Sequence, residues 1–152
     1  MKMKIVLASD HAGVQLKEQL VRFLNNSGYD VSDLGPMSEE SVDYPDTIAP
    51  AARAVAAGEA DRGVIICGSG IGASIVANKV RGVRCVLCQD IYDAEYSRLH
   101  NDANVISFGA RKLGIEKVTE CLIKWLSTPF EGGRHANRVA KIKAIEDQEA
   151  AK

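Results

Sequence analysis

Short apolar runs alternate with segments of helical spacing along the whole chain. The runs predict five strands, over residues 4–8, 29–34, 63–67, 83–88 and 104–108. The segments between and after them predict helices over 14–24, 48–57, 71–79, 91–99, 115–126 and 134–149. Strands that alternate with helices form βαβ units, in which a helix connects two parallel strands. The pattern therefore predicts an α/β fold, a three-layer αβα sandwich of the Rossmann or flavodoxin-like type with a five-stranded parallel sheet and a trailing C-terminal helix.

One domain accounts for all 152 residues. A chain of this length can bury about 70% of its unfolded surface, which is enough for a real core. No internal repeat, low-complexity tract or linker interrupts the alternation. We therefore expect a single domain over 1–152, with its last helix at about 134–149 and a tail at 150–152.

Charge and hydropathy argue against two classes of partner. The 19 Lys and Arg against 20 Asp and Glu give a net charge of -1, without the broad basic field that nucleic-acid binding needs. No apolar run approaches the roughly 18 residues that span a membrane. The charged and then apolar N-terminus breaks at residues 9–11, which fits a buried strand better than a signal peptide. Four cysteines without a signal peptide favour reduced thiols in the cytoplasm.

The expected topology also predicts where the chemistry lies. In an open parallel sheet, ligands bind beyond the carboxyl ends of the strands, at the point where the strand order reverses. With the flavodoxin-like order 2-1-3-4-5, the reversal falls between strands 1 and 3. Strand 1 ends in Ser9-Asp10-His11-Ala12-Gly13, and strand 3 ends in Cys67-Gly68-Ser69-Gly70-Ile71-Gly72. We expect a carboxylate, an imidazole, a thiol and a run of backbone amides to meet there.

The glycine-rich loop after strand 3 admits two interpretations. Gly68-x-Gly70-x-x-Ala73 fits a loose dinucleotide fingerprint, and Asp90 lies 20 residues beyond Gly70, where a ribose-binding acid belongs. That fingerprint usually follows the first strand, whereas the first strand here ends in Asp-His. In either interpretation, amides at a helix N-terminus stabilise negative charge, which is either a phosphate or an oxyanion formed during reaction.

Cys67 is the last strand residue before that helix, where the helix dipole favours the thiolate. A buried structural cysteine is the alternative, since free cysteines are often buried. A thiolate can abstract a proton or attack a carbonyl, and Ser69 can donate a hydrogen bond to the same ligand. The other thiols lie in apolar segments and predict no reactive role: Cys85, Cys88 and Cys121.

The three histidines are His11, His100 and His135, and their neighbours lack metal-ligand spacing, so we expect no metal site. His100 lies in a polar turn before strand 5 and, taken alone, fits a helix C-terminal cap better than a catalyst. Arg134 and Arg138 are four residues apart on the last helix and share a face. Such a pair is usually solvated surface, yet two guanidinium groups on one face suit a phosphate.

Six motifs follow one another over residues 4–146: Asp10-His11-Ala12-Gly13, Ser41-Val42-Asp43-Tyr44-Pro45, Cys67-Gly68-Ser69-Gly70-Ile71-Gly72, Ala77-Asn78-Lys79, His100-Asn101-Asp102-Ala103-Asn104 and Gly132-Gly133-Arg134-His135. In this order they resemble the ribose-5-phosphate isomerase B family, which also includes galactose-6-phosphate isomerase subunits. The resemblance implies interconversion of ribose 5-phosphate and ribulose 5-phosphate, in the pentose phosphate pathway and without any cofactor. Two alternatives stay open: an isomerase of allose or galactose 6-phosphate, and a nucleotide-binding α/β module.

The resemblance also implies a role for each matching residue. Cys67 would move a proton between C1 and C2, the amides of 68–72 would hold the enediolate, and His100 would open the furanose ring. Ser69, where the family more often has threonine, keeps the hydroxyl group that assists the oxyanion. Asp10 would contact the sugar or help to open its ring. The other implied substrate-binding residues are His11, Tyr44, Asn101, Arg111, Arg134 and Arg138.

Topology further predicts an active site shared between subunits. His100 precedes strand 5 at the amino edge of the sheet, whereas Cys67 lies at the carboxyl edge, and strands of this length separate the edges by roughly 17–20 Å. One sugar cannot span that distance, so we expect a homodimer with two composite sites, alone or as a dimer of dimers. The residues expected from the partner are His100, Asn101, Arg134 and Arg138. The apolar stripe expected to dock on the partner is Val139, Ile142 and Ile145.

Overall fold

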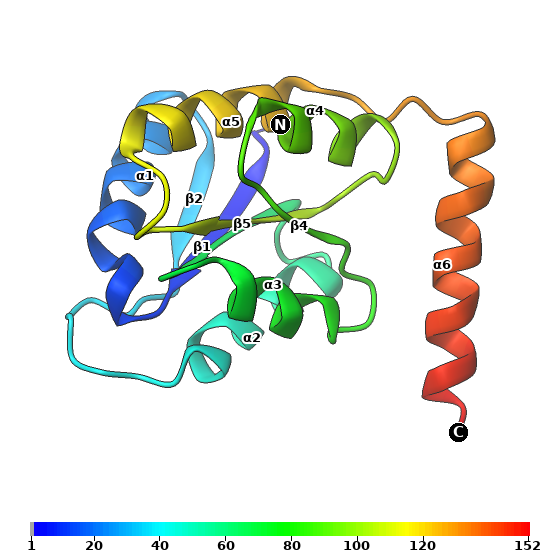
Figure 1. The fold of residues 1–152 in the computed structure, drawn as a ribbon, viewed down its shortest axis with the longest axis horizontal. Coiled ribbons are helices and arrows are strands. Elements are labelled where there is room, and N and C mark those ends of the chain that lie inside the picture. Colours follow the sequence, from blue (N-terminus) through cyan, green and yellow to red (C-terminus); the bar gives the residue numbers. More distant parts are fainter. Residues whose placement is uncertain (1) are drawn as a thin grey trace.

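A five-stranded parallel sheet lies at the centre of the structure, a computed structural model that describes residues 2–152 (Figure 1). Its strands are β1 (Lys4–Ser9), β2 (Asp30–Asp33), β3 (Arg62–Cys67), β4 (Cys85–Leu87) and β5 (Val105–Gly109). Strand β1 pairs with β2 and β3, and β5 pairs with β3 and β4, all in parallel. The predicted fold class and its five strands are therefore confirmed.

The predicted order of the last two strands is wrong. The sheet runs β2-β1-β3-β5-β4, so β5 lies beside β3 and β4 forms the edge. Burial explains this order, because all five residues of β5 are buried whereas the three residues of β4 are only half-buried. An apolar strand gains most in the interior, and a short, partly exposed strand suits an edge. The reversal between β1 and β3, which positions the site, is unaffected.

Helices cover both faces of the sheet. They are α1 (Val14–Asn26), α2 (Tyr44–Ala56), α3 (Ile71–Asn78), α4 (Ile91–Leu99), α5 (Ile115–Ser127) and α6 (Arg134–Ala150), with a short 3₁₀ helix at His11–Gly13. In β1, Ile5 and Leu7 pack with α1, α4 and α5, whereas Val6 and Ala8 pack with α2 and α3. Since neighbouring strand residues point to opposite faces, each apolar strand supplies both cores.

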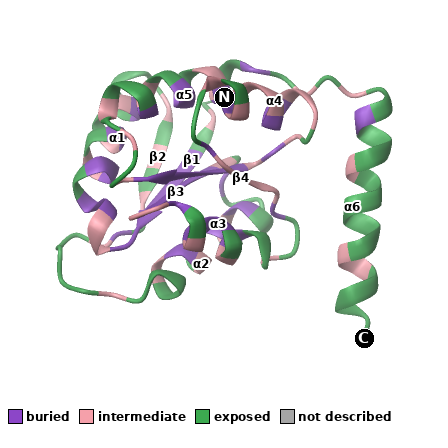
Figure 2. Ribbon diagram, in the orientation of Figure 1, coloured by how far each residue is buried: buried purple, intermediate pink, exposed green. Residues whose placement is uncertain are grey.

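Helix α6 lies apart from this sandwich and is exposed along most of its length (Figures 1 and 2). Two contacts near its C-terminal end hold it: Arg81 pairs with Asp147 at 2.7 Å, and the Gly82 N–H donates to Glu146 at 3.0 Å. A groove of about 870 Å³ separates the helix from the β4 side of the body. The side chains of Ile142 and Ile145 line this groove and remain 47% and 61% exposed. A helix with so little burial is not held by the core of its own chain.

None of the helices described between Lys2 and Lys152 is long and apolar enough to cross a membrane.

Candidate active site

The carboxyl ends of β1 and β3 open into a cleft of about 470 Å³, which we call the cysteine cleft. Its lining residues are Asp10, Tyr44, Cys67, Gly68, Ser69, Ile71, Gly72, Ile75 and Arg111. The carboxylate, the thiol and the glycine-rich loop therefore meet as the topology predicted, whereas the imidazole expected with them, His11, lines a neighbouring pocket instead. Ile75 was missed, because an apolar residue on a helix carries no sequence signal for a site. In the structure its side chain is 56% exposed at the cleft.

Cys67 ends β3, and only 5% of its surface is exposed. The Gly70 N–H donates to its Sγ at 3.2 Å, just before the N-terminus of α3. A backbone donor and a helix N-terminus both stabilise negative charge on the sulfur. The thiol therefore faces a backbone donor and a helix N-terminus, at a place where a ligand in the cleft can reach it.

The loop after Cys67 needs glycine at its centre. Gly70 has φ of 77°, and an added Cβ would lie 2.9 Å from the backbone carbon of Phe108. The Ser107 hydroxyl donates to the Gly70 carbonyl at 2.7 Å, and the Ser69 hydroxyl accepts from the Ile71 N–H at 3.2 Å. These contacts fix the amides that follow Cys67 and orient the Ser69 hydroxyl beside them.

Two further side chains in the cysteine cleft, those of Asp10 and Tyr44, lie against the backbone. Asp10 is only 8% exposed, and its Oδ1 accepts from the Gly13 N–H at 3.1 Å. The Tyr44 ring covers Gly72, where an added Cβ would lie 2.7 Å from the ring. A second glycine thus permits a close approach, and it leaves the Tyr44 hydroxyl at the rim of the cleft.

Arg111 connects the cysteine cleft to a neighbouring pocket of about 440 Å³ that contains His11. The backbone N–H of Arg111 donates to the Gly68 carbonyl at 3.0 Å, which holds the backbone of this residue against the loop. The His11 Nδ1 accepts from the Val42 N–H at 3.1 Å, so its Nε2 remains for a ligand. A guanidinium and an imidazole beside the cleft are suited to an anionic group of the ligand.

The other candidate residues form a second group at the far end of α4 and the start of α6, which we call the histidine cluster: His100, Asn101, Arg134 and Arg138. The His100 N–H donates to the Tyr96 carbonyl at 2.9 Å, so this residue is the C-terminal cap of α4, as expected. Asn101, Arg134 and Arg138 are all exposed.

Two arginines lock the turn that follows His100. The buried Arg98 donates to the Asp102 carboxylate and to the Ala103 carbonyl, both at 2.7 Å. The Arg84 side chain donates to the Asn101 carbonyl at 2.9 Å. Asp102 has a left-handed backbone with φ of 48°, which these bonds hold in place. The turn therefore presents His100 and Asn101 in one conformation.

The cysteine cleft lies at the carboxyl ends of the strands, whereas the histidine cluster lies at their amino ends. In the β3–β5 register, Cys67 pairs with Gly109 and Gly63 pairs with Val105. At about 3.3 Å per residue, the two ends of β5 are about 13 Å apart. His100 precedes even the first residue of β5. The chain does not bring Cys67 and His100 into one pocket.

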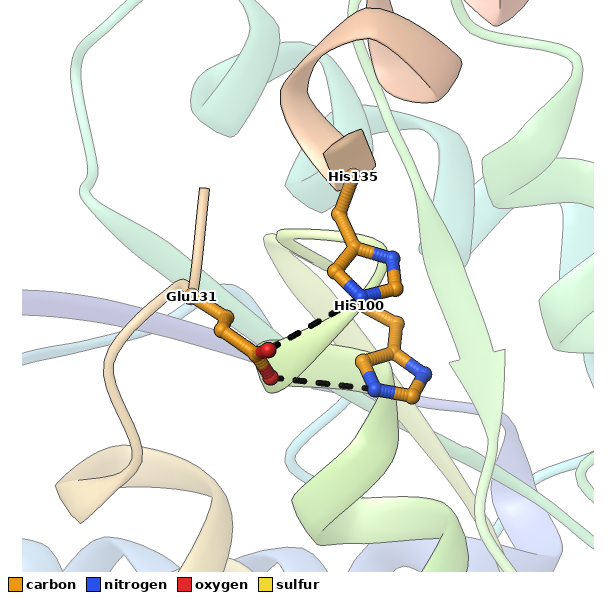
Figure 3. Close-up of side chains that lie close together, drawn as sticks. All are labelled: His100, Glu131 and His135. Atoms are coloured by element: carbon orange, nitrogen blue, oxygen red, sulfur yellow. Dashed lines mark ion pairs between the residues drawn. The ribbon is translucent and has the colours of Figure 1, made fainter. Parts of the chain in front are cut away.

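The residues beside His100 include one group that could hold a metal ion. His100, Glu131 and His135 offer ligand atoms that lie within 4.8 Å of one another (Figure 3). Two imidazoles and a carboxylate are ligands of divalent transition metals, although the sequence spacing predicted no metal site. Glu131 and His135 were missed as neighbours of His100. The one signal was their own spacing of four residues.

The candidate ribose-binding acid of the dinucleotide interpretation has a local role. The Asp90 side chain accepts from the Asp93 N–H at 3.0 Å and caps the N-terminus of α4. Asx side chains at this position stabilise a helix by about 1 kcal/mol. Asp90 does not line the cysteine cleft.

Comparison with known proteins identifies relatives over nearly the whole chain. The sequence profile of the family described as Ribose/Galactose Isomerase matches residues 5–142. The ribose-5-phosphate isomerase B of Escherichia coli K12 is 46% identical over 145 residues, which cover 95% of this chain and 97% of that protein. The D-erythrulose-4-phosphate isomerase of Pectobacterium atrosepticum is 40% identical over 149 residues, with 97% of each chain covered.

Solved structures agree with these matches. The ribose-5-phosphate isomerase B of Clostridium thermocellum has a TM-score of 0.95 at 48% identity, over 97% of this chain and 99% of that chain. The type B ribose 5-phosphate isomerase of Trypanosoma brucei has a TM-score of 0.92 at 46% identity, over 95% and 99%.

Proposed function

Because this chain belongs to the ribose/galactose isomerase family, we propose that it interconverts ribose 5-phosphate and ribulose 5-phosphate through an enediolate. The resemblance to ribose-5-phosphate isomerase B that the motifs indicated is confirmed. The nucleotide-binding alternative loses its support, since the family is one of sugar isomerases and Asp90 is a helix cap.

The observation that carries this proposal is the position of the Cys67 sulfur. It lies beside the Gly70 N–H, at the start of a helix whose first residues, Ile71 and Gly72, line the same cleft. An aldose–ketose isomerase needs one base that reaches two adjacent carbons and donors that stabilise the enediolate oxygen. The cysteine cleft supplies both within a few residues.

In the proposed reaction, the Cys67 thiolate removes the proton from C2 of the open-chain aldose. The C–H electron pair forms the C1–C2 double bond, and the aldehyde oxygen becomes the enediolate oxyanion. The amides of 68–72 and the Ser69 hydroxyl stabilise that charge. The C2 hydroxyl proton then passes to the C1 oxygen, Cys67 returns its own proton to C1, and the C2 oxygen becomes the ketone carbonyl.

Ribose 5-phosphate is mostly a closed furanose, so its ring must open first. We assign this step to His100, which donates a proton to the ring oxygen as the C1–O bond breaks, while Asp10 accepts the proton of the C1 hydroxyl. Asn101 and Tyr44 contact the sugar hydroxyls. The phosphate is held by His11, Arg111, Arg134 and Arg138.

This assignment requires a second subunit, because His100 and Cys67 lie at opposite edges of one chain. A two-fold dimer places each histidine cluster over the partner's cysteine cleft and completes two sites. Helix α6, with Ile142 and Ile145 exposed, is the element that we expect to dock on the partner. A dimer is the minimum unit, and a dimer of dimers contains the same sites.

Location and pathway belong to the same proposal. The four free cysteines fit a reducing compartment, so we place the enzyme in the cytoplasm and in pentose phosphate metabolism.

Turnover and solvent exchange test the proposed function together. The wild type should convert ribulose 5-phosphate to ribose 5-phosphate and incorporate deuterium from D₂O at C1. Both activities should disappear in Cys67→Ala, with the fold unchanged by circular dichroism. Comparing kcat/KM for ribose 5-phosphate, allose 6-phosphate and galactose 6-phosphate defines the sugar. A higher value for either hexose phosphate would replace the pentose assignment.

A further inference from the structure

The segment between α5 and α6 is fastened to the end of α4. The Glu131 N–H donates to the Leu99 carbonyl at 3.0 Å, and the Arg98 Nε donates to the Thr128 carbonyl at 3.2 Å. These two bonds connect residues about 30 positions apart in the sequence. They place Glu131 directly beside His100 before any substrate or partner is present.

Three side chains surround the His100 imidazole. Its Nε2 lies 3.8 Å from the Glu131 carboxylate, which is ion-pair distance (Figure 3). The His135 ring stacks on it with centroids 4.0 Å apart and planes 10° apart, and the Tyr96 ring meets it edge-on at 5.0 Å. One face, one edge and the Nε2 of the His100 ring therefore each have a neighbour.

The His135 imidazole is more deeply buried than the His100 imidazole. His135 is 4% exposed, and its Nε2 lies 4.0 Å from Glu131 without a hydrogen-bond partner. Burial lowers the pKa of His135 most, the neighbouring His100, Arg134 and Arg138 lower it further, and the Glu131 carboxylate opposes this shift without reversing it. His135 thus stays neutral near pH 7, and the Glu131 carboxylate lies at ion-pair distance from both rings.

We propose that Glu131 is a positioning residue for the ring-opening acid: its carboxylate orients the His100 imidazole, with the His135 ring stacked on the face of that imidazole as a wall. The inference rests on the proposed function, since it concerns the acid of that reaction. Before the furanose opens, His100 carries the proton that it will give to the ring oxygen. The Glu131 carboxylate at ion-pair distance from Nε2 and the stacked His135 ring limit the orientations of the imidazole that gives this proton.

A divalent metal at the same three side chains is the competing interpretation. Arg134 and Arg138 weigh against it, because the positive charge that lowers the pKa of His135 also opposes a dication.

Ribulose 5-phosphate makes the test specific, because its C5 oxygen is phosphorylated and it cannot close a ring. Deuterium exchange at its C1 needs Cys67 and the oxyanion donors but no ring-opening acid. In Glu131→Gln, we expect kcat with ribose 5-phosphate to fall about tenfold, while the exchange rate with ribulose 5-phosphate stays within about twofold. Glu131→Asp, which keeps a carboxylate at this position, should restore part of the rate.

Glu120→Gln, an exposed change on α5, is the matched control and should leave both rates unchanged. Turnover in Glu131→Gln equal to that control would overturn the proposal, as would an equal fall in turnover and exchange, which indicates general damage. Turnover that is lost in EDTA and restored by Zn²⁺ would instead identify His100, Glu131 and His135 as a metal site. Absence of exchange in the wild type would contradict the proposed function itself, so the two failures are distinguishable.

Discussion

The cysteine cleft and the histidine cluster are built in different ways. In the cleft, backbone groups at the ends of β1 and β3 contact the functional side chains, and Cys67 and Asp10 are almost completely buried. In the cluster, side chains on a helix cap and on α6 project outward, and Arg134 and Arg138 are exposed. A buried thiol among backbone amides is suited to proton transfer at a carbon atom. Exposed guanidinium groups are suited to binding the phosphate of a substrate that lies in the partner's cysteine cleft. The contrast suggests two half-sites with separate tasks.

Loss of the thiol should have the largest effect on activity. Removing a general base typically costs about 10²–10⁴-fold in rate, so Cys67→Ala should lose at least that much in kcat for either direction. Its KM should change little, because the phosphate contacts remain. Steady-state assays in both directions measure this. A Cys67→Ala enzyme with near-normal turnover would remove the cysteine cleft from the chemistry.

Loss of a guanidinium should act mainly on binding. Hydrogen bonds to charged groups contribute about 1.5–3 kcal/mol, so Arg138→Ala should raise KM for ribose 5-phosphate by roughly 10–100-fold. Deuterium exchange at saturating ribulose 5-phosphate should fall much less. Glu149→Gln, on the same helix, serves as the control. A change confined to kcat would place Arg138 in the chemical step rather than in phosphate binding.

Substitution of Gly70 tests the rigidity of the cysteine cleft. Gly70→Ala forces a Cβ to within 2.9 Å of the Phe108 backbone at a φ of 77°. Strain of this kind costs about 1–3 kcal/mol, so the urea midpoint should drop together with kcat. Gly132→Ala, whose φ of 72° has nothing within 4 Å, should lose less stability. Equal losses in the two variants would mean that backbone conformation alone, and not contact with β5, limits the loop.

The smallest expected effect is the pH dependence of stability at His135. Because burial lowers its pKa below the usual value of about 6.5, the unfolded chain binds a proton that the folded chain rejects. The free energy of unfolding that depends on neutral His135 is therefore fully present above about pH 6.5. It is lost as the pH falls toward the lowered pKa of the folded state. Urea midpoints between pH 5 and 8 should fall less steeply on acidification in His135→Gln. Parallel curves would show that His135 does not titrate differently on folding.

Sequence alone predicted the cysteine cleft better than the histidine cluster, for a physical reason. The residues from Cys67 to Gly72 are contiguous, and their position follows from a strand end and a helix start. The pairing of β5 with β3 was not predictable from local pattern, because two apolar runs compete for the interior and only relative burial decides. Glu131 could not be placed beside His100, since their contact depends on one backbone bond to Leu99.

Subunit mixing tests the shared site most directly. Cys67→Ala and His100→Ala, each inactive alone, are unfolded together and refolded, and hybrid dimers are isolated with two different affinity tags. Each hybrid contains one site with both residues intact, so isolated hybrids should have about half of wild-type activity and the unfractionated mixture about a quarter. Hybrid dimers that form but recover no activity would contradict the account, because they would place Cys67 and His100 in a site within one chain or in no common site.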